Sequence, residues 1–438
     1  MSMTRVLVVP GGTSVGGVAL AHAAIHKLIE IHEARQRDPD TAPARMVVAI
    51  RDPRSVPPSS LRGAATSPTE AFPADVFPEF AAHVDNPDFF DGIDLILATS
   101  GSSAGKPRLV GLSTQALIAS AEATAHALGG HGRWILALPA HHIGGAMVLA
   151  RNVIAGRSPL IVDTSNGFTP ADLLPALRAA RDTTEYPTYL SLVPLQLRSC
   201  LDADEDVLDG LRHLKAILVG GSASDPDLLA RARDAGLTIV ESYGMTETSG
   251  GCVYDGHPLA GVTVRAMDID GQPRLAISGR TLLTRYLDGD TPTIDEGGIR
   301  WLLTGDLGRI SASGQVEVFG RADDVIVSGG LNIAPAPVRI ALNSHPDVSD
   351  SWVLGTEDTK WGQVVTAVVV PSAGSAHPPL AEFGPRLRDH VGSVLGRPQA
   401  PRRLIVVDSL PHLPSGKVDR LSVRAIAEIP SEGTEWRR

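Results

Sequence analysis

The sequence predicts an α/β protein: a large N-terminal domain of parallel-type sheets with flanking helices, and a small α+β domain at the C-terminus. Three observations support this prediction. Apolar strand-like runs alternate with helix-like runs over the first three-quarters of the chain, glycines follow several strand-like runs, and short alternating strand-like runs take over after about residue 260. Alternating strands and helices are typical of βαβ units, which build parallel sheets.

The βαβ pattern is clearest in the middle of the chain, where we expect strands at residues 133–138, 189–193, 213–219 and 237–240. A helix should follow the first strand from Gly144, and another should begin at Pro194, because proline suits the first turn of a helix. For a third helix, Asp225 is the expected N-cap, Pro226 the first position and Gly236 the residue after its end. Ligands of such sheets bind at the carboxyl ends of the strands.

The domain boundary is expected near Gly320-Arg321. Residues 1–320 would form the large domain, with residues 1–92 as a short leading part, and residues 321–438 the small one. Turn signals at Asp270-Gly271 and Ser313-Gly314 separate short strands before this boundary. After it, we expect a strand at 364–370, an amphipathic helix near 380–395 and a strand at 404–407.

Charge and hydropathy exclude several classes of protein. The formal net charge of −10 argues against nucleic acid or an anionic membrane as partner, and no apolar run approaches the roughly 20 residues that span a bilayer. The apolar stretch at residues 6–9 ends at Pro10 and does not fit a signal peptide. Cys200 and Cys252 are interpreted as reduced thiols. We therefore expect a cytoplasmic protein without membrane insertion; the sequence does not indicate its oligomeric state.

A segment rich in glycine and hydroxyl residues joins a strand at 93–97 to another at 109–112. Its members are Thr99, Ser100, Gly101, Ser102, Ser103, Ala104, Gly105 and Lys106. Such residues let backbone N–H groups close around an anion, and phosphate is the obvious anion. The segment is not a Walker P-loop, because three residues rather than four separate its glycines and Pro107 follows the lysine. A flexible Gly/Ser turn is the alternative.

Two further segments offer groups that suit a nucleotide. In Tyr243-Gly244-Met245-Thr246-Glu247-Thr248, directly after a strand, the tyrosine can stack on a purine, Thr246 can bond a phosphate and Glu247 can hold Mg²⁺. A helix cap formed by Thr246 and Glu247 is the alternative. The segment from Thr304 to Gly308 is expected to form a tight loop in which Asp306 suits a ribose diol; an ordinary Asp turn is the alternative.

The last two segments carry cations. Arg321, followed by Asp323 and Asp324, is a fixed cation for a hydroxyl or phosphate, and a charged surface cluster at a linker is the alternative. Lys417 lies in Leu413-Pro414-Ser415-Gly416-Lys417-Val418-Asp419-Arg420, a glycine-hinged loop that can deliver an ammonium group to a polyphosphate. An exposed lysine in a turn is the alternative.

In their order and spacing, these five segments resemble the adenylate-forming superfamily of acyl-CoA synthetases, adenylation domains and beetle luciferases. The resemblance runs from about Ile93 to Ile426 and includes Val353-Leu354-Gly355 and Lys360-Trp361-Gly362-Gln363. It implies an acid–thiol ligase that forms an acyl-adenylate from a carboxylic acid and ATP, releasing pyrophosphate. The acyl group then passes to CoA and AMP is released. ATP, Mg²⁺ and CoA are the implied cofactors and substrates.

The resemblance also implies roles for individual residues. The Thr99–Lys106 loop would cradle the β- and γ-phosphates. Gly221, Ser222 and Ala223 would line the adenine side with Tyr243 against the ring, and Gly244 is also implied in cofactor binding. Thr246 would contact the α-phosphate, Glu247 would bind Mg²⁺, and Asp306 and Arg321 would hold the ribose hydroxyls. Lys417 would bridge the carboxylate and the α-phosphate, and Asp323 would be the hinge about which the C-terminal domain swings. The residues implied in catalysis are Lys417, Thr246, Glu247 and His142.

The acid is indicated by a narrower resemblance. Leu138 to Gly145, Arg151 in the following helix and Ser191 to Leu197 resemble the o-succinylbenzoate–CoA ligases of menaquinone biosynthesis. The residues implied near the acid are His142, Arg151, Gly220 and Gly244. Arg151 is the candidate for the second carboxylate of this diacid, with a helix-surface salt bridge as the alternative. The competing functions are ligation of another aromatic or medium-chain acid, loading of a carrier protein, and non-catalytic nucleotide binding.

The sequence departs from the superfamily pattern in four places. The region before Thr99 is short, so residues 1–92 would be a reduced form of the usual leading part. The phosphate loop has one extra residue around Ala104, and Arg108 stands where lysine is usual. Pro337 and Arg339 replace two acidic residues expected after Asn332.

Overall fold

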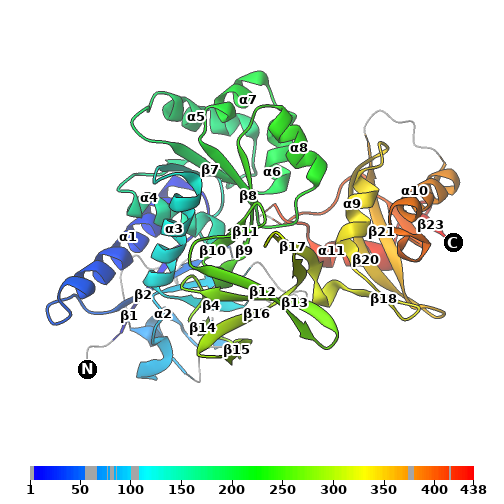
Figure 1. The fold of residues 1–438 in the computed structure, drawn as a ribbon. Helices are drawn as coiled ribbons and strands as arrows, with labels where there is room; N and C mark the ends of the chain where they lie inside the picture. The colour runs from blue at the N-terminus through cyan, green and yellow to red at the C-terminus, as the bar shows by residue number, and fades with distance from the viewer. Residues whose placement is uncertain are drawn as a thin grey trace. The chain divides into compact units, whose positions relative to one another are not determined.

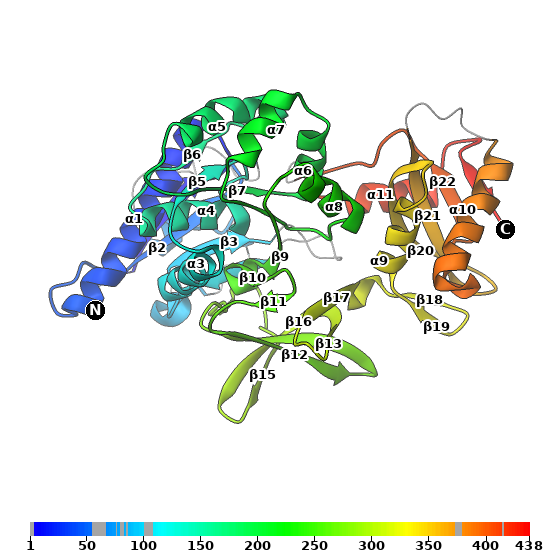
Figure 2. The same ribbon diagram turned by 45° about the horizontal axis from the view of Figure 1, so that its top comes forward.

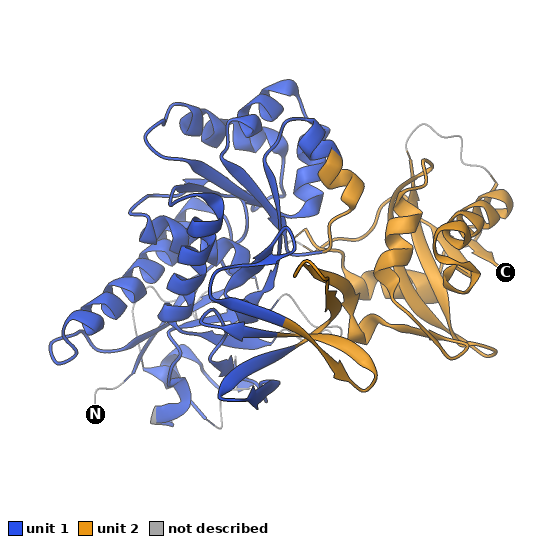
Figure 3. Cartoon of the chain, in the orientation of Figure 1, with its two compact units in different colours: residues 1–222, 231–264, 277–303 blue, residues 223–230, 265–276, 304–438 orange. Residues whose placement is uncertain are grey.

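The computed structural model describes residues 4–54, 67–75, 77–78, 83–84, 86–99, 108–372, 379–413 and 416–438. The chain forms two compact units (Figure 3). Unit 1 comprises residues 1–222, 231–264 and 277–303, and unit 2 comprises residues 223–230, 265–276 and 304–438. The boundary predicted near Gly320-Arg321 was that between a large domain and a small one. It stays a prediction.

Unit 1 contains a mixed five-stranded sheet in the order β1-β2-β3-β4-β14. Its strands are β1 (Arg5–Pro10), β2 (Met46–Arg51), β3 (Leu95–Ala98), β4 (Leu109–Leu112) and β14 (Arg285–Tyr286). β1, β2 and β3 are parallel, whereas β4 is antiparallel to both β3 and β14. The predicted strands on either side of the Gly/Ser-rich segment are therefore an antiparallel pair.

The second sheet of unit 1 has seven strands in the order β11-β10-β9-β8-β7-β5-β6. They are β5 (Arg133–Leu136), β6 (Leu160–Ile161), β7 (Thr188–Leu192), β8 (Ala216–Gly220), β9 (Ile239–Met245), β10 (Gly250–Tyr254) and β11 (His257–Pro258). The five strands from β5 to β9 are parallel, as the βαβ rhythm predicts. β8 begins later than expected because His213 is the C-cap of the preceding helix.

The helices of this part are α1 (Val15–Arg37), α2 (Pro68–Ala71), α3 (Thr114–Leu128), α4 (Ile143–Ile154), α5 (Leu174–Arg181), α6 (Pro194–Leu201), α7 (Glu205–Arg212) and α8 (Pro226–Asp234). The predicted helix starts near Gly144 and at Pro194 and Pro226 are confirmed. Asp225 accepts a hydrogen bond from the Asp227 N–H at 3.0 Å, as expected of an N-cap. Helix α1 packs on β1 and β2, α4 packs on β5 and β10, and both helices contact α3 (Figure 1).

A third sheet confirms the expected change after residue 260. Antiparallel strands replace the βαβ pattern: β12 (Val262–Ile269), β13 (Gln272–Gly279), β15 (Thr293–Glu296), β16 (Ile299–Ile310) and β17 (Val316–Arg321). Asp270 and Gly271 both have positive φ, which suits the tight turn between β12 and β13. Gly314 has a φ of 82° in the connection between β16 and β17.

The six-stranded sheet of unit 2 has helices on both faces. Its strands are β18 (Ile326–Ser328), β19 (Leu331–Ile333), β20 (Val348–Asp358), β21 (Gly362–Pro371), β22 (Arg403–Val406) and β23 (Glu435–Arg437), and its helices are α9 (Pro335–Asn343), α10 (Leu380–Leu395) and α11 (Arg420–Glu428). Val365, Ala367 and Val369 of β21 pack with α9 and α10, whereas Val368 packs with α11. Side chains of a strand point alternately to opposite faces, so one strand serves two cores. Figure 2 shows α10 and α11 on opposite sides of β20–β22.

Within the described parts of the chain, no helix is long and apolar enough to cross a membrane.

Candidate active site

The ends of the Gly/Ser-rich segment are held together by two hydrogen bonds. The N–H of Thr99 donates to the carbonyl oxygen of Arg108 at 2.8 Å, and the N–H of Arg108 donates to the Thr99 hydroxyl at 2.8 Å. The antiparallel pairing of β3 with β4 therefore continues to the base of the loop. The predicted phosphate-binding residues Ser100, Gly101, Ser102, Ser103, Gly105 and Lys106 lie outside the described residues.

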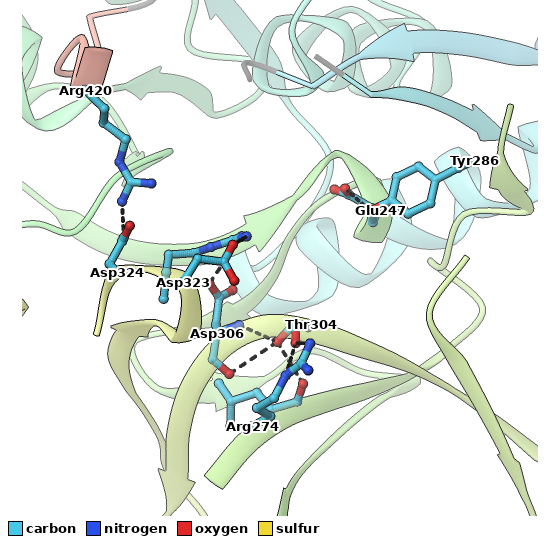
Figure 4. Close-up of polar contacts among 10 residues, drawn as sticks. Glu247, Arg274, Tyr286, Thr304, Asp306, Asp323, Asp324 and Arg420 are labelled. Carbon is cyan, nitrogen blue, oxygen red and sulfur yellow. Dashed lines mark hydrogen bonds and ion pairs between the residues drawn. The ribbon is translucent and has the colours of Figure 1, made fainter. Parts of the chain in front are cut away.

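A tyrosine links the base of this loop to Glu247. The guanidinium carbon of Arg108 lies 3.5 Å from the centre of the Tyr286 ring, a cation–π contact. The hydroxyl of Tyr286 donates a hydrogen bond of 2.6 Å to Oε1 of Glu247 (Figure 4). The side chain of Arg108 is also anchored by Asp288, 3.5 Å away. This link involves only residues of unit 1, and it fixes one carboxylate oxygen of a buried glutamate.

Thr246 and Glu247 begin a short 3₁₀ turn (Thr246–Thr248) directly after β9. The sequence predicted that Tyr243 and Gly244 follow the strand. This is wrong, because β9 extends to Met245 and contains both residues. The Thr248 hydroxyl stabilises the turn, since it accepts from the Met245 N–H at 2.9 Å and donates to the Gly250 carbonyl at 2.7 Å. A Cβ on Gly244 would lie 2.1 Å from that same carbonyl oxygen. Glycine is thus required where β9 and β10 approach most closely.

Gly220 is the last residue of β8, and Gly221, Ser222 and Ala223 follow it. Gly220 pairs with Ser242 of β9, and a Cβ at this position would lie 2.5 Å from the Ser242 carbonyl oxygen. Gly221 has a φ of 85°, a conformation that glycine adopts at little cost. Gly221, Ser222 and Ala223 are exposed. The strand end therefore leads into an open turn one strand away from Tyr243.

The paired histidines occupy different environments. His142 is the N-cap of α4, partly exposed, and its ring centre lies 4.4 Å from that of His141. His141 is buried and accepts a hydrogen bond of 3.0 Å from the Gly12 N–H through Nδ1. Burial lowers the pKa of His141, with a smaller opposing effect of Asp52. His141 thus holds the loop after β1, and His142 is the more accessible of the two.

Arg151 lies in the last turn of α4, and its side chain is enclosed. Its guanidinium carbon is 4.7 Å from the centre of the Trp134 ring, and Nη2 donates to the Thr124 hydroxyl at 3.3 Å. Nε has no hydrogen-bond partner, and the described residues place no carboxylate in an ion pair with this arginine. Burial lowers its pKa, and Tyr254 partly offsets this. At 1.5 Å per residue, Arg151 is about 13 Å further along the helix than His142.

Asp306 of β16 is the register partner of Arg321 of β17, and both residues belong to unit 2. Figure 4 shows Asp306 beside Asp323. Asp306 is buried, and its Oδ1 is 3.7 Å from Nη1 of Arg321. Nη2 of Arg321 also donates to Asp323 at 3.2 Å. Burial alone would lower the pKa of Arg321, but the carboxylates of Asp306, Asp323 and Asp324 raise it above its ordinary value. The guanidinium therefore stays charged beside a carboxylate that it orients.

The prediction of a tight loop around Asp306 is wrong, because Thr304–Gly308 lies within β16, with a bulge between Leu307 and Gly308. Glycine is needed at two positions of this segment because β17 approaches closely there. A Cβ on Gly305 would lie 2.6 Å from Nη2 of Arg321, and one on Gly308 would lie 2.4 Å from the Glu317 carbonyl oxygen. Both glycines are needed for close packing against β17 and not for a turn.

Lys417 lies in a short loop before α11. Its carbonyl oxygen accepts from the Leu413 N–H at 2.7 Å, and Gly416 has a φ of 77°. His412 and Val418 pair on either side. Gly416 therefore adopts a left-handed conformation directly before Lys417, and both the hinge and the role of the lysine stay predictions.

Two groupings of predicted residues result, each within one unit. Thr246, Glu247 and the base of the Gly/Ser-rich loop are connected in unit 1, and Asp306 is paired with Arg321 in unit 2. The sequence analysis missed Tyr286, which no motif pairs with a glutamate 39 positions earlier. Among the described residues, no group of three or more His, Cys, Asp or Glu could hold a metal ion. Mg²⁺ is often held by one or two carboxylates together with substrate phosphates, so a single Glu247 suits such an ion.

Comparison with known proteins supports the motif analysis. Residues 18–283 match the family described as AMP-binding enzyme, and residues 340–417 match the AMP-binding enzyme C-terminal domain. A probable 2-succinylbenzoate–CoA ligase of Mycobacterium tuberculosis is 41% identical over 336 residues, which are 76% of this chain and 84% of the relative. A 2-succinylbenzoate–CoA ligase of Bacillus subtilis is 30% identical over 75% of this chain and 68% of the relative.

The fold is shared with solved structures. The o-succinylbenzoate CoA synthetase of Bacillus subtilis, in complex with the acyl-adenylate intermediate OSB-AMP, matches with a TM-score of 0.67 and 24% identity. The match covers 96% of this chain and 88% of that one.

We expect Tyr286→Phe to destabilise unit 1, because it removes the hydroxyl that bonds Glu247 and keeps the ring beneath Arg108. A hydrogen bond to a carboxylate contributes about 1.5–3 kcal/mol, and the partial exposure of Tyr286 places the loss at the lower end. Urea unfolding measures it. Tyr186→Phe is the matched control, since that ring also lies under an arginine, Arg157, at 4.1 Å. An equal loss in both variants would contradict the importance of the Glu247 bond.

Proposed function

Because the chain belongs to the family of AMP-binding enzymes, we propose that it is an ATP-dependent acid–CoA ligase whose acid is o-succinylbenzoate. The main support for this substrate is the 41% identity to a relative named as a probable ligase for the same acid. The segment Leu138–Gly145 and the N-cap His142 of α4 agree with it.

In the first half-reaction, a carboxylate oxygen of the acid attacks the α-phosphorus of ATP, and the bond to pyrophosphate breaks. Both reactants are anionic, so positive charge and oriented donors must offset their repulsion. The proposed donors are the Thr99–Lys106 loop for the β- and γ-phosphates, Thr246 for the α-phosphate and Lys417 for the reacting oxygens. Glu247 would hold Mg²⁺, which neutralises phosphate charge when bound.

For the nucleoside, we propose separate contacts to the ribose and to the adenine. Asp306 is buried and lies beside the charged Arg321, so its carboxylate suits a ribose diol, which offers two donors. The open turn at Gly221, Ser222 and Ala223 and the half-buried Tyr243 offer backbone and a ring to adenine. In the second half-reaction, the CoA thiolate attacks the acyl carbon of the mixed anhydride, and AMP leaves with the bonding electrons.

We also propose that the two half-reactions use different placements of the C-terminal domain, which turns about Asp323. The reason is that Lys417 belongs to the predicted small domain and the phosphate loop to the predicted large one. A hinged domain can bring the lysine to the phosphates in only one of its arrangements. The lysine then serves adenylate formation alone.

The function is tested with a panel of carboxylic acids incubated with the protein, ATP, Mg²⁺ and CoA. AMP release and the thioester mass are measured. We expect o-succinylbenzoate to have the highest kcat/KM, because the likeness to ligases for this acid includes the segment around His142. A higher value for another aromatic or medium-chain acid would replace the substrate, and absence of turnover with every acid would contradict the ligase.

Arg151 is proposed to recognise the second carboxylate, since it is a buried guanidinium outside any described ion pair. We expect Arg151→Ala to raise KM for o-succinylbenzoate far more than for a monocarboxylate analogue. Breaking a buried charge pair costs about 3–5 kcal/mol. Steady-state kinetics measure both constants, and Arg157→Ala is the control, because Arg157 also stacks on an aromatic ring. Equal increases for both acids would show that Arg151 only supports α4 against Trp134.

For Lys417→Ala, we expect adenylate formation to fall by about 10²–10³-fold, as for one donor lost at a developing charge. Thioester formation from supplied acyl-adenylate and CoA should be nearly unchanged, because the lysine acts in the first step only. Single-turnover kinetics of each step measure this, with Lys215→Ala, an exposed lysine before β8, as control. An equal loss in both steps would rule out the alternation of domains.

A further inference from the structure

Asp324 and Arg420 form an ion pair between two segments that lie 96 positions apart in the chain. Asp324 ends the short 3₁₀ helix Ala322–Asp324, which directly follows Arg321 and contains the proposed hinge residue Asp323. Arg420 is the first residue of α11, three positions after Lys417. Nη2 of Arg420 donates to Oδ2 of Asp324, and Figure 4 shows the two side chains pointing toward one another. Both residues belong to unit 2.

The other contacts of Arg420 fix α11 on its sheet. Its guanidinium carbon lies 5.6 Å from the centre of the Trp352 ring on β20. Arg339 lies 5.4 Å from the same ring and forms its own ion pair with Asp350 at 3.4 Å. The following turns of α11 bury Val423 and Ala427 in the core beneath β20–β22.

The loop that carries Lys417 is tied to the same helix end. Asp419 is the N-cap of α11, and its side chain accepts from the N–H groups of Leu421 and Ser422. Its own N–H donates to the carbonyl oxygen of Pro411 at 2.9 Å. Val418 packs into the core under α11. The backbone of Lys417 is therefore fixed relative to Arg420 from both sides.

We infer that the Asp324–Arg420 ion pair is a positioning device for Lys417. Asp324 follows the proposed hinge at once, so a rotation there moves Asp324, and the ion pair passes that rotation to the lysine loop. The two side chains are 26% and 37% exposed, and pairs of this exposure contribute little to stability. Geometry is then the property that the pair supplies. This inference rests on the proposed role of Lys417 in adenylate formation.

The test is single-turnover kinetics of both half-reactions in Asp324→Asn, Arg420→Ala and the double variant. We expect each single variant to slow adenylate formation by about tenfold or more, because a displacement of about 1 Å costs up to a hundredfold in rate. Thioester formation from supplied acyl-adenylate should stay within about twofold, since Lys417 does not act in that step. The double variant should be no slower than either single one, and Arg420→Lys should recover part of the rate.

Arg339→Ala is the matched control, because it removes an ion-paired arginine from the same tryptophan ring without touching the hinge segment. It should slow neither half-reaction selectively. Equal losses in both half-reactions for Asp324→Asn, an unchanged rate, or losses that add in the double variant would each overturn the inference.

Hydrogen exchange provides a readout that needs no activity. In Asp324→Asn, the backbone amides of Leu413, Gly416 and Asp419 should exchange faster than in Arg339→Ala. If the unmodified protein forms no adenylate with any acid, the proposed function fails, and exchange still decides whether the tie exists. Equal exchange in the two variants would exclude it.

Discussion

The placement of Arg321 depends on the absence of a side chain at Gly305. The guanidinium of Arg321 lies against Gly305 of β16, where a Cβ would come within 2.6 Å of Nη2. In this position it meets Asp306 on the neighbouring strand. Because Arg321 also bonds Asp323, the position of this arginine sets the start of the segment that leads to Asp324. The missing Cβ of Gly305 thus permits the contacts of Arg321 with both Asp306 and Asp323.

Unit 1 solves a similar problem with an aromatic ring. For its proposed role as a ligand of Mg²⁺, Glu247 needs one defined orientation, yet a glutamate side chain has three rotatable bonds. Tyr286 limits that freedom, since its hydroxyl holds Oε1 of Glu247 and its face receives Arg108 at the base of the loop. The loop end, the tyrosine and the glutamate therefore respond together when any one of them is displaced.

Local signals were enough to predict the parallel strands β5, β7, β8 and β9 and the helix starts between them, but not the unit formed by β1, α1 and β2. Pro194 and Pro226 mark helix starts, and Asp225 caps one of them, because these effects depend only on neighbouring residues. The five motifs likewise identified Glu247, Asp306 and Lys417 as candidates. Gly305 and Gly308 misled the prediction, since their signal is that of a turn and their cause is the packing of β17, a strand beyond the local sequence. Tyr286 and the enclosure of Arg151 by Trp134 and Thr124 depend on contacts between separate elements, which no spacing reveals.

The surroundings of Trp352 have an optical consequence. Two guanidinium groups, those of Arg339 and Arg420, lie within 6 Å of its ring centre, and the emission of an indole depends on the electric field at the ring. A change in the distance of either charge shifts that emission. The chain has five tryptophans, so replacing the other four would leave an internal fluorophore that reports on the contact between α11 and β20. The emission wavelength of Trp352 would then report a change in this contact without an attached dye.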